Sequence, residues 1–232
     1  MSLLTLCSNV AKQIGVGVPT IIIGNTDETA VRLLALANRS GKSLMRKHNW
    51  AVLIKEATVT TVASTANYSL ESDYDRSISD TAWDRTNYDK MRRQTTAQWQ
   101  FRKSAIVSDV TRKNWRIKPN ANTKTLYIDP TPTAVETLVY EYVSNQWCQS
   151  SGGTGQTAWA VDTDIGVLDE DLLELDLHWR MLKAEGFEYA EERDEFDKQL
   201  ELAIGNDGGA QTLNMQGQSS GLFTNVPETG FG

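Results

Sequence analysis

The chain has 232 residues, of which 40% are hydrophobic and 23% charged, with a formal net charge of −7. This length allows one large domain or two small ones with a real core, and the acidic balance argues against a protein that coats nucleic acid. No run approaches the roughly 20 apolar residues of a membrane span. Cys7 and Cys148 are too few for a disulfide framework or a zinc site. We therefore expect two buried free thiols in a soluble protein made in a reducing cytoplasm.

Residues 1–50 predict two helices. Apolar residues near helical spacing favour a short helix from Leu3 to Ile14, which Gly15 would end. Residues 25–28 then supply polar N-cap candidates for a second helix. Its apolar positions repeat every three or four residues: Ala30, Leu33, Leu34, Ala37, Gly41, Leu44, Met45 and His48.

Inside this second helix, Gly41-Lys42-Ser43 is the tripeptide that closes a phosphate-binding loop. Such a loop also needs a glycine five residues before Gly41, where this chain has Leu36. Amides in the middle of a helix are engaged in helical hydrogen bonds and cannot cradle a phosphate. We expect Gly41 to allow close packing of a neighbouring element, Lys42 to be a solvated charge, and no nucleotide to bind.

Residues 51–160 predict a β domain. Strand signals fall at 52–54, 57–62, 105–110, 114–117, 126–128 and 137–143, and residues 129–137, with two prolines, form a turn between the last two. Residues 68–101 are typical of a loop-rich stretch with scattered aromatic residues, and residues 150–156 of a flexible loop. These spacings predict an antiparallel sandwich or open barrel.

Residues 161–205 predict a second helical part that packs on residues 1–50. Apolar residues at helical spacing form one packing face, here called the seam, on either one long helix or two helices joined near Gly186. The acidic residues from Asp169 to Asp171 suit a helix N-terminus. The seam alternates steps of four and three: Leu168, Leu172, Leu175, Trp179, Leu182, Gly186, Tyr189, Arg193, Phe196, Leu200 and Ala203. The expected fold is therefore α+β, with a helical layer beside the β domain.

The last 27 residues, Asn206 to Gly232, contain six glycines and almost no charge. They show no amphipathic pattern and predict an extended C-terminal arm. Its sparse apolar residues suit backbone pairing with isolated side chains in pockets. These anchors are Leu213, Met215, Leu222, Phe223, Val226 and Phe231.

No constellation of residues indicates an active site. Glu174 and His178 share a helical face, but a di-iron bundle would need Glu-x-x-His pairs on two helices. Residues 162–166 resemble the start of a calcium loop, yet the glycine is one place early and the twelfth position is Leu173. No serine has a nucleophile-elbow pattern or a plausible histidine partner. We predict no enzyme activity, no metal and no cofactor.

The charges are unevenly distributed. Residues 76–124 hold twelve basic and four acidic residues, a net of +8, whereas residues 162–201 hold fifteen acidic and four basic residues, a net of −11. This uneven distribution would be explained if each segment formed a separate solvated face of the protein. In a self-assembling protein, one subunit's basic β domain could instead meet a neighbour's acidic helices. The basic segment 76–124 and its aromatic residues also allow an alternative function, a nucleic-acid-binding accessory protein or enzyme.

The C-terminal half resembles bacteriophage head-to-tail adaptor proteins, the ring-forming neck proteins related to tail tubular protein A and tail accessory factors of short-tailed phages. "IDPTPTAVETLVYEYVSNQWC" and "DTDIGVLDEDLLELDLHWRMLKAEGFEYAEERDEFDKQLELA" carry the resemblance, with "KHNW" and "YSLESDYDRSISDTAWDR" in the first half. The order of elements agrees over residues 1–205, most specifically at 162–186.

The resemblance implies a virion protein of the neck, assembled into a ring, usually twelvefold, under the portal protein. Its lower face would receive a tail or nozzle protein. Genomic DNA would pass through its lumen without sequence-specific binding. The arm would then run along a neighbouring subunit or into the portal. A negatively charged channel wall repels phosphates, so some of six glutamates would face the channel or line a subunit interface. The alternative is that they form a solvated outer face. The six are Glu174, Glu185, Glu188, Glu191, Glu192 and Glu195.

Overall fold

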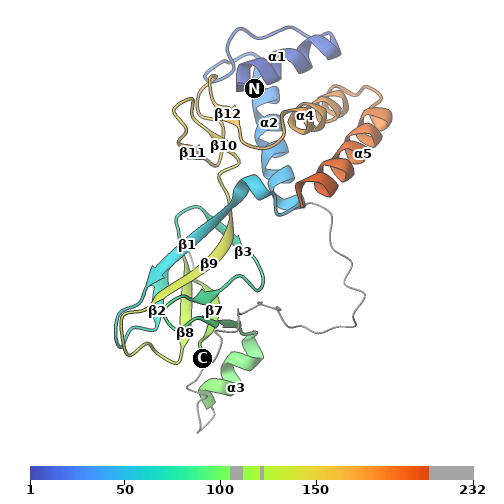
Figure 1. Cartoon of the computed structure of the whole chain (residues 1–232). Helices are drawn as coiled ribbons and strands as arrows, with labels where there is room; N and C mark the ends of the chain where they lie inside the picture. The colour runs from blue at the N-terminus through green and yellow to red at the C-terminus, as the bar shows by residue number, and fades with distance from the viewer. Residues whose placement is uncertain (105–111, 121–122, 209–232) are drawn as a thin grey trace, which may run out of the picture.

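The computed structural model describes residues 1–104, 112–120 and 123–208, and it places a helical part and a β part at opposite ends (Figure 1). The helical part comprises α1 (Leu3–Ile14), α2 (Glu28–Lys47), α4 (Glu170–Glu185) and α5 (Ala190–Asp207). Helix α4 packs against α1, α2 and α5, so it lies at the centre of this part. The predicted packing of N-terminal on C-terminal helices is confirmed.

Local signals set the helix ends. Ser2 caps the start of α1, because its Oγ accepts a hydrogen bond from the Thr5 amide at 3.2 Å, and Gly15, with φ 79°, caps its end. Asp27 and Asp169 cap α2 and α4 in the same way. Gly186, with φ 82°, ends α4. The C-terminal seam is therefore carried by two helices, which excludes one continuous helix.

The predicted seam is only partly right. Leu172, Phe196 and Leu200 are buried, but Arg193 is exposed. Leu177 and Met181, which the seam left out, are fully buried. The reason is that α4 contacts three other helices and buries more than one face, whereas a single stripe describes a helix with one partner.

Helix α2 passes without interruption through Gly41, as predicted. A Cβ built on Gly41 would lie 2.1 Å from Cε3 of Trp147, so only glycine allows the indole to sit against this helix. Lys42 is exposed. The structure thus confirms a packing role for Gly41.

The β part contains two larger sheets. The first has the order β1 (Ile54–Thr60), β9 (Thr137–Ser144), β4 (Trp83–Asp84) and β5 (Asp89–Lys90), with β3 (Tyr74–Ser77) also paired to β9. The second has the order β2 (Asn67–Ser69), β8 (Thr123–Asp129), β7 (Asn114–Asn120) and β6 (Arg92–Arg93). One hydrophobic core joins them, drawing on both sheets: Tyr74, Trp115, Leu126, Ile128, Leu138, Tyr140 and Tyr142.

The sheets differ from the purely antiparallel arrangement that we expected, because β6 pairs with β7 in parallel. A third, small sheet has the order β11 (Gly155–Gln156), β10 (Cys148–Gln149) and β12 (Ile165–Gly166), and it lies beside the helices (Figure 1). The prediction of a loop over 150–156 was therefore wrong at its end, where β11 forms. Strands of two residues are too short to produce a periodic pattern.

Other element predictions need correction. Residues 51–53 form a short 3₁₀ helix rather than a strand, and β1 begins at Ile54 and ends at Thr60. The stretch 68–101, expected to be rich in loops, contains β3 to β6 and the start of α3 (Thr96–Ser104). Only Trp99 is buried on α3, so this helix has no row of buried apolar residues that the sequence could reveal. The strand expected at 105–110 lies outside the described residues. The turn over 129–137 is confirmed as the connection from β8 to β9.

The close contact at Gly41 generates a prediction. Gly41→Ala should lower the free energy of unfolding by about 2 kcal/mol, because the new methyl group overlaps the Trp147 ring. Gly205→Ala on α5 is the matched control. A Cβ there meets nothing within 4 Å, and alanine should raise stability by about 0.5 kcal/mol. Urea unfolding followed by tryptophan fluorescence measures both, and equal effects at the two glycines would contradict the packing role.

Candidate assembly surfaces

The basic segment 76–124 lies in a part of the protein that is close to neutral. Residues 51–160 as a whole contain thirteen basic and eleven acidic residues, a net of +2. By contrast, residues 1–50 and 161–208 together contain ten basic and eighteen acidic residues, a net of −8. Ion pairs within the chain therefore decide which of these charges remain available to a partner.

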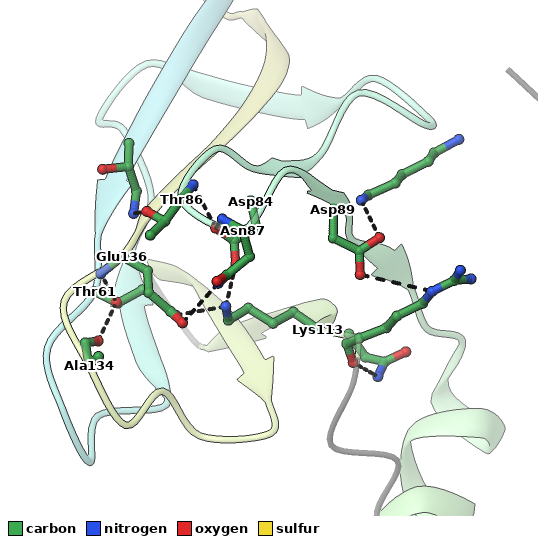
Figure 2. A network of polar contacts seen from close by, with 12 residues as sticks. Thr61, Asp84, Thr86, Asn87, Asp89, Lys113, Ala134 and Glu136 are labelled. Carbon is green, nitrogen blue, oxygen red and sulfur yellow. Dashed lines mark hydrogen bonds and ion pairs between the residues drawn. The ribbon is translucent and has the colours of Figure 1, made fainter. Parts of the chain in front are cut away.

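Lys113 is the centre of a polar network in the β part (Figure 2). Its Nζ contacts the Asp84 carboxylate and lies 2.7 Å from Oε2 of Glu136. Asp84 Oδ1 also accepts hydrogen bonds from the amides of Thr86 at 2.9 Å and Asn87 at 3.1 Å. The side chains of Asp84 and Lys113 are only 3% and 13% exposed. The network ties the β4–β5 turn to the start of β7 and to the segment before β9.

The environment keeps these groups charged. Burial alone would raise the pKa of Asp84, but hydrogen bonds from Lys113 and Asn87 hold this pKa below its usual value. Burial alone would lower the pKa of Lys113, but Asp84 and Glu136 raise it above its usual value. A general acid or base needs a pKa near the working pH. The pKa of Asp84 is lowered and that of Lys113 is raised, both away from neutral pH, which suits a structural ion pair.

Other basic residues of the segment also have partners in the β part. Arg102 and Lys103 lie 3.2 and 2.5 Å from the Asp129 carboxylate. Arg85 pairs with Glu56 at 2.6 Å. Further contacts are the ion pair of Lys90 with Asp80, the ion pair of Arg112 with Asp89, and the positions of Lys118 over Trp99 and Arg93 over Trp115.

The aromatic residues of this segment offer little for stacking with bases. Trp99 and Trp115 are at most 3% exposed, and they belong to the interior of the β part. Tyr88 and Phe101 are well exposed. Because stacking platforms need open aromatic faces next to unpaired cations, the segment gives little support to the nucleic-acid-binding alternative.

Two of the six candidate glutamates hold the helical part together. Glu174 accepts hydrogen bonds from Asn9 at 3.2 Å and Gln13 at 2.7 Å, which joins α4 to α1. Glu185 lies 2.6 Å from Arg32, which joins α4 to α2. Their carboxylates are thus engaged within the chain.

The other four candidate glutamates lie around α5. Glu188 accepts from the Ala190 amide at 3.2 Å, at the start of the helix. Glu191 and Glu195 are exposed on α5, and Glu192 is half-buried. The structure therefore separates the six residues into interior contacts and outward positions rather than bringing them to one site.

Aspartates in the calcium-like stretch bind backbone amides. Asp162 accepts from the amides of Ile22 and Ile23 at 3.0 and 2.7 Å. Asp164 accepts from those of Ala160 and Val161 at 2.6 and 2.8 Å. Among the described residues, no three His, Cys, Asp or Glu side chains gather as a metal site requires. These acids shape loops at the edge of the helical part.

Residues that often carry chemistry have packing roles here. Nε2 of His48 lies 3.4 Å from the Asp207 carboxylate, and its ring meets Trp50 edge-on. Cys7 and Cys148 are buried as predicted, and burial raises the pKa of each thiol to about 12. Neither cysteine is a thiolate at neutral pH, so neither is a ready nucleophile.

Sequence reasoning missed a basic face on α2. Arg39, Lys42 and Arg46 are exposed, on the side of the helix opposite the buried Ala37 and Leu44. Their steps of three and four residues were available as a signal. The phosphate-loop tripeptide contains Lys42 but neither Arg39 nor Arg46.

The predicted arm begins later than expected. Asn206 and Asp207 belong to α5, and Asp207 accepts a hydrogen bond from the Ala51 amide at 2.8 Å. The arm anchors Leu213, Met215, Leu222, Phe223, Val226 and Phe231 lie outside the described residues. Within the described ranges, no helix combines the length and apolar character that crossing a membrane requires.

The buried ion network predicts a large effect of removing its cation. Lys113→Met should lower the free energy of unfolding by about 3 kcal/mol, because it leaves the buried Asp84 carboxylate without its counter-charge. Arg112→Met is the matched control. Arg112 is half exposed and 3.9 Å from Asp89, so its loss should cost less than about 1 kcal/mol. Urea unfolding of both variants checks this, and similar losses would contradict the structural role of the network.

The same network predicts a dependence on pH. The folded-state pKa of Asp84 is lowered, so its contribution to stability is complete above the unfolded pKa of about 3.9 and is lost as pH falls through the folded value. The wild-type free energy of unfolding should therefore fall between about pH 5 and pH 2 more steeply than that of Asp84→Asn. Asp80→Asn, in an exposed pair with Lys90, should keep the wild-type slope. Identical slopes in wild type and Asp84→Asn would refute this assignment.

Comparison with known proteins relates most of the chain to a protein family. The family model described as SU10 adaptor protein matches residues 1–220. No curated protein matches the chain. The matched range includes both the helical and the β part.

Proposed function

Because this chain belongs to the SU10 adaptor protein family, a family of phage adaptor proteins, we propose that it forms the ring that joins the capsid portal to the tail. It is a structural protein of the virion rather than an enzyme. The family match over residues 1–220 carries the proposal, because it includes every element described above.

The shape of the chain supports a role between two partners. The helical part and the β part lie at opposite ends (Figure 1), and they differ in charge, with −8 in the described helical part against +2 in residues 51–160. One end would dock to the portal protein and the other to a tail or nozzle protein. An adaptor needs two such distinct surfaces, and a ring of these chains, usually twelvefold in similar proteins, would present them above and below.

The acidic helices suit a passage for DNA. Phosphates bind to Lys and Arg and are repelled by carboxylates. The described helical part carries an excess of carboxylates, and Glu191 and Glu195 are exposed on α5. We propose that these outward acids face the channel or line a subunit interface. Genomic DNA would then pass without sequence-specific binding.

The C-terminal arm supplies an attachment. The described chain ends at Gly208, just after Asp207 is held by the Ala51 amide. From this fixed point, the 24 residues that follow include the apolar anchors Leu222, Phe223 and Phe231. We propose that they bury these side chains on a neighbouring adaptor subunit or on the portal.

The direct test of the function is the neck of the particle. Phage that lack this chain should fill capsids that do not join tails, and supplying the chain should restore tailed particles. A cryo-EM map of the restored neck should show a ring of this fold under the portal. Tailed, infectious particles in the absence of the chain would refute the proposal.

A truncation tests the arm. Deleting residues 217–232 should leave the thermal midpoint within about 2 °C of wild type, since the described core contains none of these residues. Binding to purified portal rings should fall at least tenfold. A substitution of Gln218 by Ala serves as the control and should leave binding unchanged. Wild-type affinity of the truncated chain for the portal and for its own neighbours would contradict the arm hypothesis.

A further inference from the structure

The outward face of α2 carries a straight row of positive charge. Arg39, Lys42 and Arg46 follow one another at steps of three and four residues, which places them on one side of a helix. All three are exposed, and no ion pair engages them within the part of the chain that the structure describes. We call these three residues the basic stripe.

The outward face of α5 carries a matching row of negative charge, which we call the acidic stripe. It lies opposite the buried Phe196 and Leu200. Lys198 lies on the same face, so four carboxylates leave a net charge of −3. The acidic stripe consists of exposed residues without an ion pair among the described ones: Glu191, Asp194, Glu195 and Glu201.

The two stripes are not arranged to neutralise each other within one chain. Helix α4 packs against both α2 and α5, and both stripes face away from the packed sides of their helices. The contact between α2 and α5 is made instead by Lys47, which lies 3.9 Å from Asp197 and 4.4 Å from the centre of the Phe196 ring. Each stripe therefore remains available to another molecule.

We propose that the basic stripe of one copy binds the acidic stripe of the next copy, which makes α2 and α5 the two sides of the subunit interface. This rests on the proposed ring. Two different, complementary faces on one chain make a head-to-tail contact, and such contacts close into rings when the rotation is right. At 1.5 Å per residue the basic stripe is about 10 Å long and the acidic one about 15 Å, so they can lie along each other.

This assignment changes the partner of the acidic helices. From the sequence, a neighbour's basic β domain was one candidate partner for them, with two solvated faces as the alternative. Many of the cations of that segment are engaged in the β part, whereas those of the basic stripe are free of ion pairs among the described residues. Exposed pairs are individually weak and sensitive to salt, so the interface needs several of them together.

The purified chain tests this by charge reversal. One variant carries Arg39→Glu, Lys42→Glu and Arg46→Glu, and a second carries Glu191→Lys, Asp194→Lys and Glu201→Lys. At about 20 mM salt, where exposed charges are weakly screened, wild type should self-associate. Each variant alone should associate more weakly, with a midpoint concentration of association at least tenfold higher than that of wild type. A 1:1 mixture of the two should assemble in alternation, because each reversed stripe then meets an opposite one. Arg92→Glu with Arg93→Glu, exposed residues of β6, is the control and should associate like wild type.

Circular dichroism and thermal midpoints near wild type establish that the variants fold, and sedimentation velocity measures association. Wild-type association of either reversed variant would overturn the pairing and leave the adaptor function intact. A mixture that stays dissociated would overturn it as well. A wild-type chain that stays monomeric at low salt also overturns it, whereas the adaptor function is judged separately by tail joining in particles. If reversing the basic stripe abolishes only the binding of duplex DNA, that stripe faces DNA and the pairing is wrong.

Discussion

The contact between Trp147 and Gly41 is the point on which the arrangement of the two parts depends. Trp147 lies shortly after the end of β9, where the chain passes from the β part into the helical part. Its indole is 1% exposed, donates to the carbonyl of Thr157 at 3.0 Å and meets the ring of Trp159 edge-on. One side chain thus connects α2, the small third sheet and the end of β9. The missing Cβ of Gly41 is what makes room for it.

The helical part was predictable because its signals are local. Ser2, Asp27 and Asp169 mark helix starts, and Gly15 and Gly186 mark helix ends, through hydrogen bonds with residues two to four positions away. The β part was less predictable. Strands of two residues are too short to show a period, and α3 buries only one side chain, Trp99. Their positions depend instead on partners far along the chain, as when β6 pairs with β7 in parallel.

The candidate surfaces show the same division. Counting charges along the chain correctly located a basic and an acidic segment, but it did not reveal which charges find partners. Asp84 and Glu136 neutralise Lys113 from positions 29 and 23 residues away. Glu174 and Glu185 bind groups more than 150 residues distant. The fold decides that Glu174 and Glu185 are engaged within the chain and that the acids on α5 are exposed. The sequence therefore predicted the surplus of negative charge but not where on the surface it lies.

The β part begins and ends at one place. Strands β1 and β9, its first and last long strands, are paired along their whole length, with Ile54 opposite Val143 and Thr60 opposite Thr137. The segment between α2 and the third sheet is thus a cassette inserted into a helical scaffold made by both halves of the chain. A cassette whose ends are neighbours can be lengthened, shortened or exchanged while the scaffold keeps its packing. The turns and strand lengths of the cassette can therefore diversify while the contacts of α4 with α1, α2 and α5 are kept.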